Sequence, residues 1–247
     1  FIGLATLQVF KELNLDYEIC KPTDSFDNEL ILYGGGGSLI RKYAGSKRFL
    51  LNNHDKNHIV VLPHSFNDCD DLLMSLSDEV FLIAREKISY DYIKSKTNHK
   101  NNCLLSSDMS FYIKGIDKYK NRSCTGVCNA FRLYDELDNK NEPLRVPQDN
   151  KDISLDFQRP IFMKNWGIPN NLNAQVEKNF SIATDNLFSY ISKFKTVNTN
   201  HLHVGIAAAL IGKTVNLYRG SYHKISGVYD FSMVNKFDNV TFYETNP

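Results

Sequence analysis

The sequence predicts an α/β protein made of two Rossmann-like domains whose parallel sheets face a central cleft. Apolar runs typical of buried strands alternate with segments of helical period along nearly the whole chain, which is typical of parallel sheets with helices on both faces. The length of 247 residues allows one large or two small domains. A polar segment at residues 119–123 divides the alternation, so the predicted domains are residues 1–120 and 121–247.

The first half contains the elements of the first predicted sheet. Helical periodicity predicts helices at residues 1–13, 70–76 and 89–96. Runs of apolar and β-branched residues predict strands at residues 17–20, 29–33, 58–66, 79–86 and 103–113, the last together with its loop. The strand HIVVLPHSF is expected to turn at Leu62 and Pro63. Because the chain begins inside a helical segment, we expect a strand upstream of Phe1.

The second half restarts with the strand-like run GVCNAFRL at residues 126–133. A polar stretch at residues 138–152 predicts a surface loop, and residues 186–194 predict a helix. A strand end at residue 196 is then followed by a small-residue helix at 204–211 and by the strand TVNLY. Asn198, Thr199 and Asn200 are predicted N-cap residues of that helix, and Gly212 ends it.

Composition excludes several classes of protein. A net charge of +1 gives no reason to expect a nucleic acid partner. No run approaches the roughly 18 apolar residues that suggest a membrane span. The 5 cysteines fit a reducing compartment, and no second Cys pair completes a metal site, so we expect no metal. The expected location is the cytoplasm; the alternatives are the membrane periphery, or the Golgi lumen for a eukaryotic chain with an N-terminal anchor.

The glycine run after LILY is the first candidate binding site. Gly34, Gly35, Gly36 and Gly37 leave a backbone without side chains that a ligand can approach closely, and Ser38 follows them. A dinucleotide fingerprint would need Gly where Leu39 stands, and no Gly-Lys-Ser/Thr follows for a P-loop. A structural turn is the competing interpretation. His64 and Ser65, at the end of another predicted strand, complete this candidate site, although a structural histidine is the competing interpretation there.

The start of the helix after residue 200 is the second candidate site. His201 and His203 are expected in its first turn, beside free backbone N–H groups and the positive end of the helix dipole. Such a combination favours an anion. Polar residues at a loop edge are the competing interpretation.

The ordered segments LILYGGGGSLI, VVLPHS, FLIAREKISYDYI, SSDMSF and VNTNHLHVGIAAALIGKTV resemble the polysaccharide pyruvyl transferases over nearly the whole chain. The resemblance implies a two-domain architecture like that of GT-B glycosyltransferases. It also implies transfer of an enolpyruvyl unit from phosphoenolpyruvate to a sugar, forming a ketal. Phosphoenolpyruvate would be the donor substrate, a glycan or its precursor would be the acceptor, and no cofactor is implied. The oligomeric state stays open.

The resemblance extends to single residues. The family's Ala-Arg-Glu-x-x-Ser segment matches Ala84, Arg85, Glu86 and Ser89, and its acidic residue closing the first domain matches Asp108. Its Arg-Leu-His segment at the anion site of the second domain matches His201, Leu202 and His203. His201 stands where the family usually has Arg, and an imidazole is a weaker, pH-dependent cation.

The reaction suggests a role for each candidate. Arg132 is the expected anion clamp, and His203 is the expected general acid or phosphate ligand. Lys224 is expected to add charge at the rim, and Arg85 to bind substrate or to form a structural ion pair. Residues 121–247 would then bind the donor, and residues 1–120 the acceptor. Two other functions remain: a glycosyltransferase that uses a nucleotide sugar, and a catalytically silent glycan-binding relative.

Overall fold

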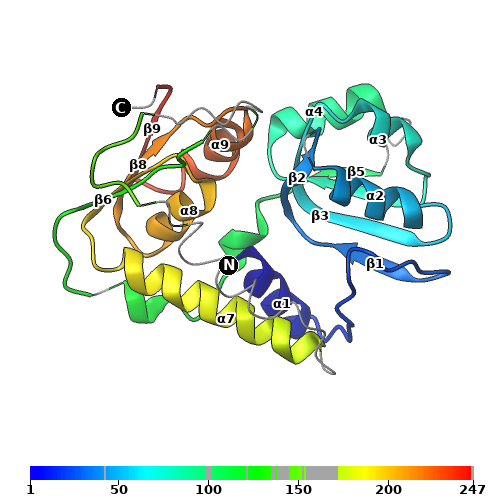
Figure 1. Ribbon diagram of the computed structural model, residues 1–247, viewed down its shortest axis with the longest axis horizontal. Coiled ribbons are helices and arrows are strands. Elements are labelled where there is room, and N and C mark those ends of the chain that lie inside the picture. Colours follow the sequence, from blue (N-terminus) through cyan, green and yellow to red (C-terminus); the bar gives the residue numbers. More distant parts are fainter. Residues whose placement is uncertain are drawn as a thin grey trace. The chain divides into compact units, whose positions relative to one another are not determined.

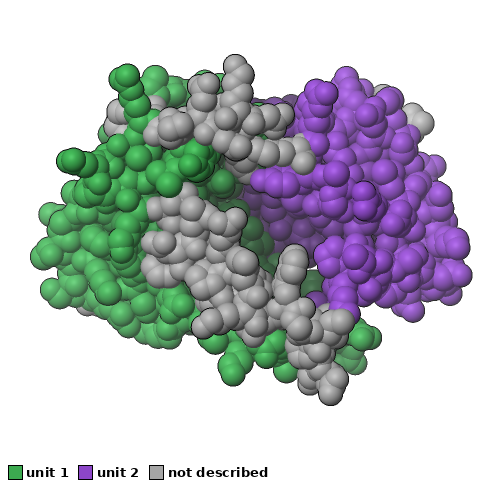
Figure 2. All heavy atoms as spheres, viewed as in Figure 1, with its two compact units in different colours: residues 1–18, 110–229, 233–247 green, residues 19–109, 230–232 purple. Residues whose placement is uncertain are grey.

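The computed structural model describes residues 1–41, 43–97, 102–120, 122–134, 137, 145–151, 153 and 172–245. These residues form a mixed α/β structure with two parallel sheets, as predicted (Figure 1). The chain divides into two compact units, coloured separately in Figure 2. Unit 1 comprises Phe1–Glu18, Ser110–Tyr229 and Met233–Pro247; unit 2 comprises Ile19–Met109 and Asp230–Ser232.

Unit 2 is built around the first sheet, in which β1 and β2 both pair with β3 and the path continues through β4 to β5. All these pairs are parallel. The strands are β1 (Leu30–Tyr33), β2 (Gly36–Ile40), β3 (His58–Asn67), β4 (Val80–Ala84) and β5 (Cys103–Leu105). The connecting helices are α2 (Ala44–Asn53), α3 (Asp70–Ser75) and α4 (Lys87–Lys96), and η1 (Met109–Tyr112) follows β5. Apolar side chains of these strands and helices form one core, which includes Leu50, Ile59 and Leu82.

Unit 1 is built around the second sheet, a parallel sheet in the order β6-β7-β8-β9. Its strands are β6 (Val127–Ala130), β7 (Thr196–Thr199), β8 (Thr214–Tyr218) and β9 (Val240–Tyr243). Its helices are α1 (Ile2–Glu12), α7 (Leu172–Ile191), α8 (Leu202–Leu210) and α9 (Lys224–Val228), with η2 (Asp117–Tyr119). The π-helical turn η3 (Tyr229–Met233) follows α9, and its central residues belong to unit 2. The predicted surface loop at 138–152 lies largely outside the described residues.

The observed units differ from the predicted division at residue 120 in the placement of the first helix. α1 packs against α7 and shares a buried apolar cluster with β6, α8 and β8 (Figure 1). The contact is close, because a Cβ atom on Gly3 would lie 2.4 Å from the ring of Phe180 in α7. The helix therefore belongs with the second sheet, and the chain enters unit 2 only after residue 18.

The second sheet has two unlike faces. A Cβ atom on Gly205 of α8 would lie 2.8 Å from Leu217 and 3.7 Å from Thr199, so α8 covers the face that holds these buried side chains. The opposite face carries a ladder of asparagines, in which Asn216 donates to Asn198 and Asn198 donates to Asn129, each at 2.8 Å. Helices were predicted on both faces of the sheets. In the described part of the chain, this arrangement is not found for the second sheet.

One predicted turn proved to be a strand interior. β3 runs through Pro63 to Asn67, because the register of its pairing shifts between Val61 and His64, where the missing N–H of proline is tolerated. The glycine run follows the end of β1 at Tyr33, as predicted, but a further strand begins within it: β1 pairs with the first half of β3, and β2 starts at Gly36 beside the second half. The predicted strand at residues 17–20 is irregular chain.

Candidate functional site

The carboxyl ends of the second sheet bring together the candidates predicted for anion binding. Ala130 of β6, Thr199 of β7 and Leu217 of β8 are in register, so the residues that follow them emerge at one edge of the sheet. We call this group the second-sheet edge; it comprises Arg132, Asn200, His201, Leu202, His203 and Lys224. In parallel sheets, this edge is where ligands bind.

Two side chains join the ends of β6 and β7. The Thr199 hydroxyl donates to the carbonyl of Ala130 at 2.6 Å and accepts from the backbone N–H of His201 at 2.9 Å. The Oδ1 atom of Asn200 accepts from the backbone N–H of Arg132 at 2.8 Å. These bonds fix the backbone of Arg132 relative to the start of α8.

The predicted capping of α8 is wrong in its detail. The N-cap residue is His201, and no side chain forms a cap hydrogen bond, because Thr199 and Asn200 have the partners just described. The first N–H groups of a helix have no acceptor within the helix. An uncapped start, with the positive end of the dipole, is an environment that favours an anion.

The side chains of this edge differ in their access to solvent. His201 and Leu202 are buried, with exposed fractions of 4% and 2%, whereas Arg132 and His203 are half-buried. The ring of His203 meets the ring of Phe1 edge-on, with 6.1 Å between the centroids. Lys224, expected at the rim of the cleft, is buried with an exposed fraction of 7%, and its ammonium lies 5.1 Å from the ring centre of Tyr222.

The candidates from the first half of the sequence lie together in unit 2. We call them the first-sheet cluster; it comprises Gly34, Gly35, Gly36, Gly37, Ser38, His64, Ser65, Arg85 and Asp108. Gly35 fits only as glycine, because a Cβ atom there would lie 2.9 Å from the carbonyl oxygen of Pro63. Gly36 has a φ of 152°, which other residues rarely adopt. The glycines thus allow the edge strand to bend around His64.

His64 holds the bend in place. Its Nε2 atom accepts from the backbone N–H of Ser38 at 2.8 Å and from that of Leu39 at 3.3 Å. Burial, and after it the charge of Arg85, lowers the pKa of His64 to about 3. The ring is therefore neutral at neutral pH, and it supports the glycine backbone without acting as a proton donor or acceptor in the physiological range.

Arg85 and Asp108 form a buried ion pair within the same cluster. The distance from Arg85 Nη1 to Asp108 Oδ2 is 2.7 Å, and both side chains are completely buried. The Nε atom of Arg85 also donates to the hydroxyl of Ser65 at 2.8 Å. Ser65 and Arg85, both predicted as substrate ligands, are thus paired with each other, and Arg85 has its charge balanced by Asp108.

The rest of the Ala-Arg-Glu-x-x-Ser segment has a local structural function. Glu86 is the N-cap of α4, and its carboxylate accepts from the backbone N–H of Ser89 at 2.8 Å. The hydroxyl of Ser89 in turn accepts from the backbone N–H of Phe66 at 2.7 Å and so ties α4 to β3. Glutamate is not a preferred N-cap residue, and the usual capping box has Ser or Thr first and Glu three residues later, so no signal in the sequence indicated this cap.

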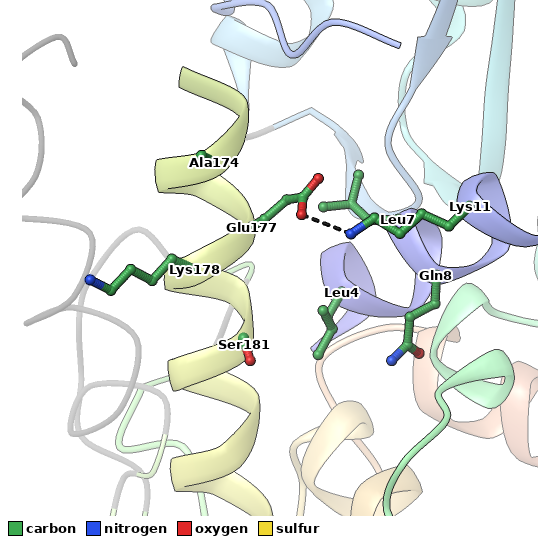
Figure 3. Close-up of a pocket in the computed structure, with 8 residues that line it drawn as sticks. All are labelled: Leu4, Leu7, Gln8, Lys11, Ala174, Glu177, Lys178 and Ser181. Carbon is green, nitrogen blue, oxygen red and sulfur yellow. Dashed lines mark hydrogen bonds and ion pairs between the residues drawn. The ribbon is translucent and has the colours of Figure 1, made fainter. Parts of the chain in front are cut away.

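A groove lies between α1 and α7, away from the strand ends. Its volume is about 370 Å³, and Lys11 and Glu177 form an ion pair of 2.8 Å across it (Figure 3). Its lining is Leu4, Leu7, Gln8, Lys11, Ala174, Glu177, Lys178 and Ser181. The groove gathers no residue of either predicted site.

The described residues contain neither a cluster of metal ligands nor a membrane-spanning helix. No group of three or more His, Cys, Asp or Glu side chains in these ranges is placed to hold a metal ion. No described helix has both the length and the apolar character needed to cross a membrane.

Comparison with known proteins gives the family. The family model for polysaccharide pyruvyl transferase matches residues 1–216. The chain is also similar to the crystal structure of a functionally uncharacterised protein from Klebsiella pneumoniae, with 30% sequence identity and a TM-score of 0.77, covering 99% of this chain and 87% of that one. No curated protein matched closely enough to count as a relative. Since the family model spans most of the chain, the chain belongs to the polysaccharide pyruvyl transferase family.

Proposed function

We propose that the protein transfers the enolpyruvyl group of phosphoenolpyruvate to a sugar of a glycan or glycan precursor, forming a pyruvate ketal. The observation that carries the proposal is the second-sheet edge, where Arg132, Lys224 and an uncapped helix start come from successive strand ends. Family membership supports the same reaction class.

The charges of the donor explain the composition of this edge. Phosphoenolpyruvate carries a phosphate and a carboxylate, so its binding requires several cations or N–H donors. Arg132 offers a planar fork of N–H groups that can bind one of these groups through two hydrogen bonds. Lys224 adds a second positive charge, and the first turn of α8 adds backbone N–H groups. The reaction needs no resident cofactor, because the donor already carries the activated group.

The proposed reaction proceeds in two bond-forming steps. One sugar hydroxyl adds to C2 of the donor while a proton is delivered to C3, which turns the methylene into a methyl group. A second hydroxyl of the same sugar then bonds to C2 as the C2–O bond to phosphate breaks. One hydroxyl proton is therefore balanced by the new methyl hydrogen, and the other leaves with the phosphate. His203, half-buried in the first turn of α8, is the proposed proton donor or phosphate ligand.

Unit 2 is the proposed acceptor side. Its bent glycine backbone at Gly34–Gly37 gives a hydroxylated ligand close access to main-chain groups. His64 is neutral at neutral pH, and Arg85 is balanced by Asp108, so this cluster has little net charge. A cluster of this kind suits the hydroxyl groups of an uncharged sugar better than an anion.

Ligand-induced thermal stabilisation and turnover test the proposal. Phosphoenolpyruvate should raise the melting temperature, because a ligand that binds only the folded state stabilises it, whereas nucleotide sugars should not. With a suitable acceptor, release of phosphate should accompany formation of the ketal. Stabilisation by a nucleotide sugar alone would favour a glycosyltransferase, and binding without turnover on any acceptor would favour a silent relative.

Two arginine-to-alanine variants test whether the donor binds at the second-sheet edge. Arg132→Ala should weaken donor binding strongly, since removing one partner of a desolvated charge pair costs about 2–5 kcal/mol. Arg122→Ala is the control, because Arg122 is exposed, precedes the amino end of β6, and donates through Nε to the backbone carbonyl of Lys118 at 3.2 Å. Unchanged donor affinity in Arg132→Ala would remove this residue from the proposed site.

A further inference from the structure

We infer that Asn200 is an anion-binding residue of the second-sheet edge, whose Nδ2 atom donates to the anion while its Oδ1 atom holds Arg132 in place. The identity of the anion as phosphoenolpyruvate rests on the proposed function. The inference that Asn200 binds an oxyanion rests on the hydrogen bonds and burial of this side chain.

Only the oxygen of the Asn200 side-chain amide has a hydrogen-bond partner among the described residues. Asn200 is 5% exposed, and its Oδ1 atom accepts from the backbone N–H of Arg132 at 2.8 Å. No described residue accepts a hydrogen bond from its Nδ2 atom, which carries two N–H donors. Nδ2 is not among the side-chain atoms that are both sealed from solvent and without a partner, so its donors are open to an acceptor that comes from outside the described chain, water or an anion.

Neighbouring asparagines show how different Asn200 is. On the face of the same sheet, Asn198 and Asn216 each donate through Nδ2 to the next rung of the ladder at 2.8 Å. Asn150 uses both ends of its amide on Phe131, accepting at 2.7 Å and donating at 3.1 Å. In these residues the amide nitrogen is used within the protein. In Asn200 it remains available.

The position of the amide points its donors to the proposed donor site. Both polar atoms of Asn200 lie in one plane, and the bond to the Arg132 nitrogen fixes that plane at the end of β6. The residue after Asn200 is the N-cap of α8, whose first turn has no capping side chain. The proposed oxyanion would accept hydrogen bonds from Nδ2 and from the first backbone N–H groups of α8, while the Arg132 N–H stays bonded to Oδ1.

Two substitutions separate anion binding from positioning of Arg132. Asn200→Asp keeps an oxygen that can accept from the Arg132 N–H but removes the donors, whereas Asn200→Ala removes both. Affinity for phosphoenolpyruvate, and separately for inorganic phosphate, would be measured by calorimetry. Both variants should bind each anion about 10- to 100-fold more weakly, the loss expected for hydrogen bonds to a charged group. Hydrogen exchange at the Arg132 amide should stay slow in Asn200→Asp and become fast in Asn200→Ala.

Asn216→Asp is the control for the added negative charge. It places a carboxylate in the same sheet, on the adjacent strand, and in register with Asn198 rather than with Asn200. Its affinity for both anions should stay within about threefold of that of the wild-type protein, because Asn216 lies within β8 and bonds Asn198 rather than a residue of the second-sheet edge. An equal loss in Asn216→Asp and Asn200→Asp would overturn the inference, as would wild-type affinity in Asn200→Asp.

The two anions keep the inference distinct from the proposed function. If the wild-type protein binds inorganic phosphate but neither binds nor uses phosphoenolpyruvate, the proposed function fails and the phosphate data still decide the role of Asn200. If it binds neither anion, the role of Asn200 is overturned together with the donor site.

Discussion

At the scale of single residues, His203 has the position required of a catalytic group. It lies in the first turn of α8, half-buried, with Phe1 against its ring. Its neighbour His201 is almost completely buried, so His203 is the more accessible of the two imidazoles. His203, rather than His201, is therefore the residue that we propose for proton transfer during ketal formation.

Substitution of His203 distinguishes proton transfer from binding. His203→Ala should lower turnover by about 10²–10⁴, the usual contribution of a general acid or base. His203→Gln keeps a hydrogen-bond donor, so it should bind phosphoenolpyruvate more tightly than the alanine variant without regaining turnover. Steady-state kinetics and donor affinity check both variants. Full activity in His203→Gln would reduce the residue to a ligand, and full activity in His203→Ala would exclude both roles.

His64 makes stability depend on pH in a defined direction. Its pKa is lowered from 6.5 to about 3 in the folded state, so between these values the unfolded chain binds more protons than the folded one. The stabilisation from a neutral His64 is thus complete above pH 6.5 and is lost as the pH falls towards 3. The free energy of unfolding should fall by up to about 1.4 kcal/mol per pH unit in this window.

Denaturant unfolding between pH 5 and 7 measures this effect, a window in which few carboxylates titrate. His64→Gln keeps an acceptor but cannot be protonated, so its stability should vary less with pH than that of the wild-type protein. His58→Gln, at an exposed histidine paired with Glu79, should keep the wild-type slope. Parallel pH profiles for His64→Gln and the wild-type protein would contradict the assignment.

At the scale of elements, the bend between β1 and β2 depends on one glycine. A Cβ atom on Gly35 would lie 2.9 Å from the carbonyl oxygen of Pro63, in the middle of β3, and 3.3 Å from Cγ of Met109. Gly34 beside it has no atom within 4 Å of a Cβ position. The two glycines are adjacent in sequence but have different steric requirements.

Alanine substitutions should show this difference. Gly35→Ala forces the edge strand away from β3, and we expect a loss of about 1–3 kcal/mol in the free energy of unfolding, as for other overpacked sites. Gly34→Ala should change stability little or raise it slightly, because alanine restricts the unfolded chain. Chemical denaturation of both variants provides the measurement. A neutral Gly35→Ala would mean that the bend is not fixed by this contact.

At the scale of the whole molecule, unit 1 is assembled from the two ends of the chain. α1 and α7 are separated by about 160 residues of sequence, yet Lys11 and Tyr17 both bind Glu177, at 2.8 and 2.6 Å. Leu7 of α1 is 6% exposed and lines the groove beside α7 (Figure 3). The stability of α7 should therefore depend on the first helix.

Hydrogen exchange tests this dependence. Leu7→Ala should cost about 2–5 kcal/mol, as for other buried leucines, and should speed exchange in α7 and β7. Leu13→Ala is the matched control, because Leu13 is 63% exposed. Exchange in β3 and β4 of unit 2 should be unchanged in both variants. Faster exchange in β3 and β4 but not in α7 would contradict the division into units.

The sequence by itself determined the class of fold and most elements of strong periodicity. The helices at α1, α3, α4 and α8 and the strands at β1, β3, β4, β7 and β8 follow from apolar spacing, which is a local property of the chain. The run from residue 196 to 218 also placed the two histidines correctly at a helix start. The first turn of that helix could be recognised because each of its signals lies within a few residues.

Only the tertiary structure decided which partners these residues have. Asn200 was expected to cap α8, yet it bonds Arg132 from 68 residues away, and Arg85 pairs with Asp108 from 23 residues away. The continuation of β3 through Pro63 likewise depends on the register of its neighbours. The side-chain amide of Asn200 can form its hydrogen bond either by capping α8 or by bonding Arg132 at the end of β6. The choice between them depends on the free energy of packing distant segments together, which no local window of sequence contains.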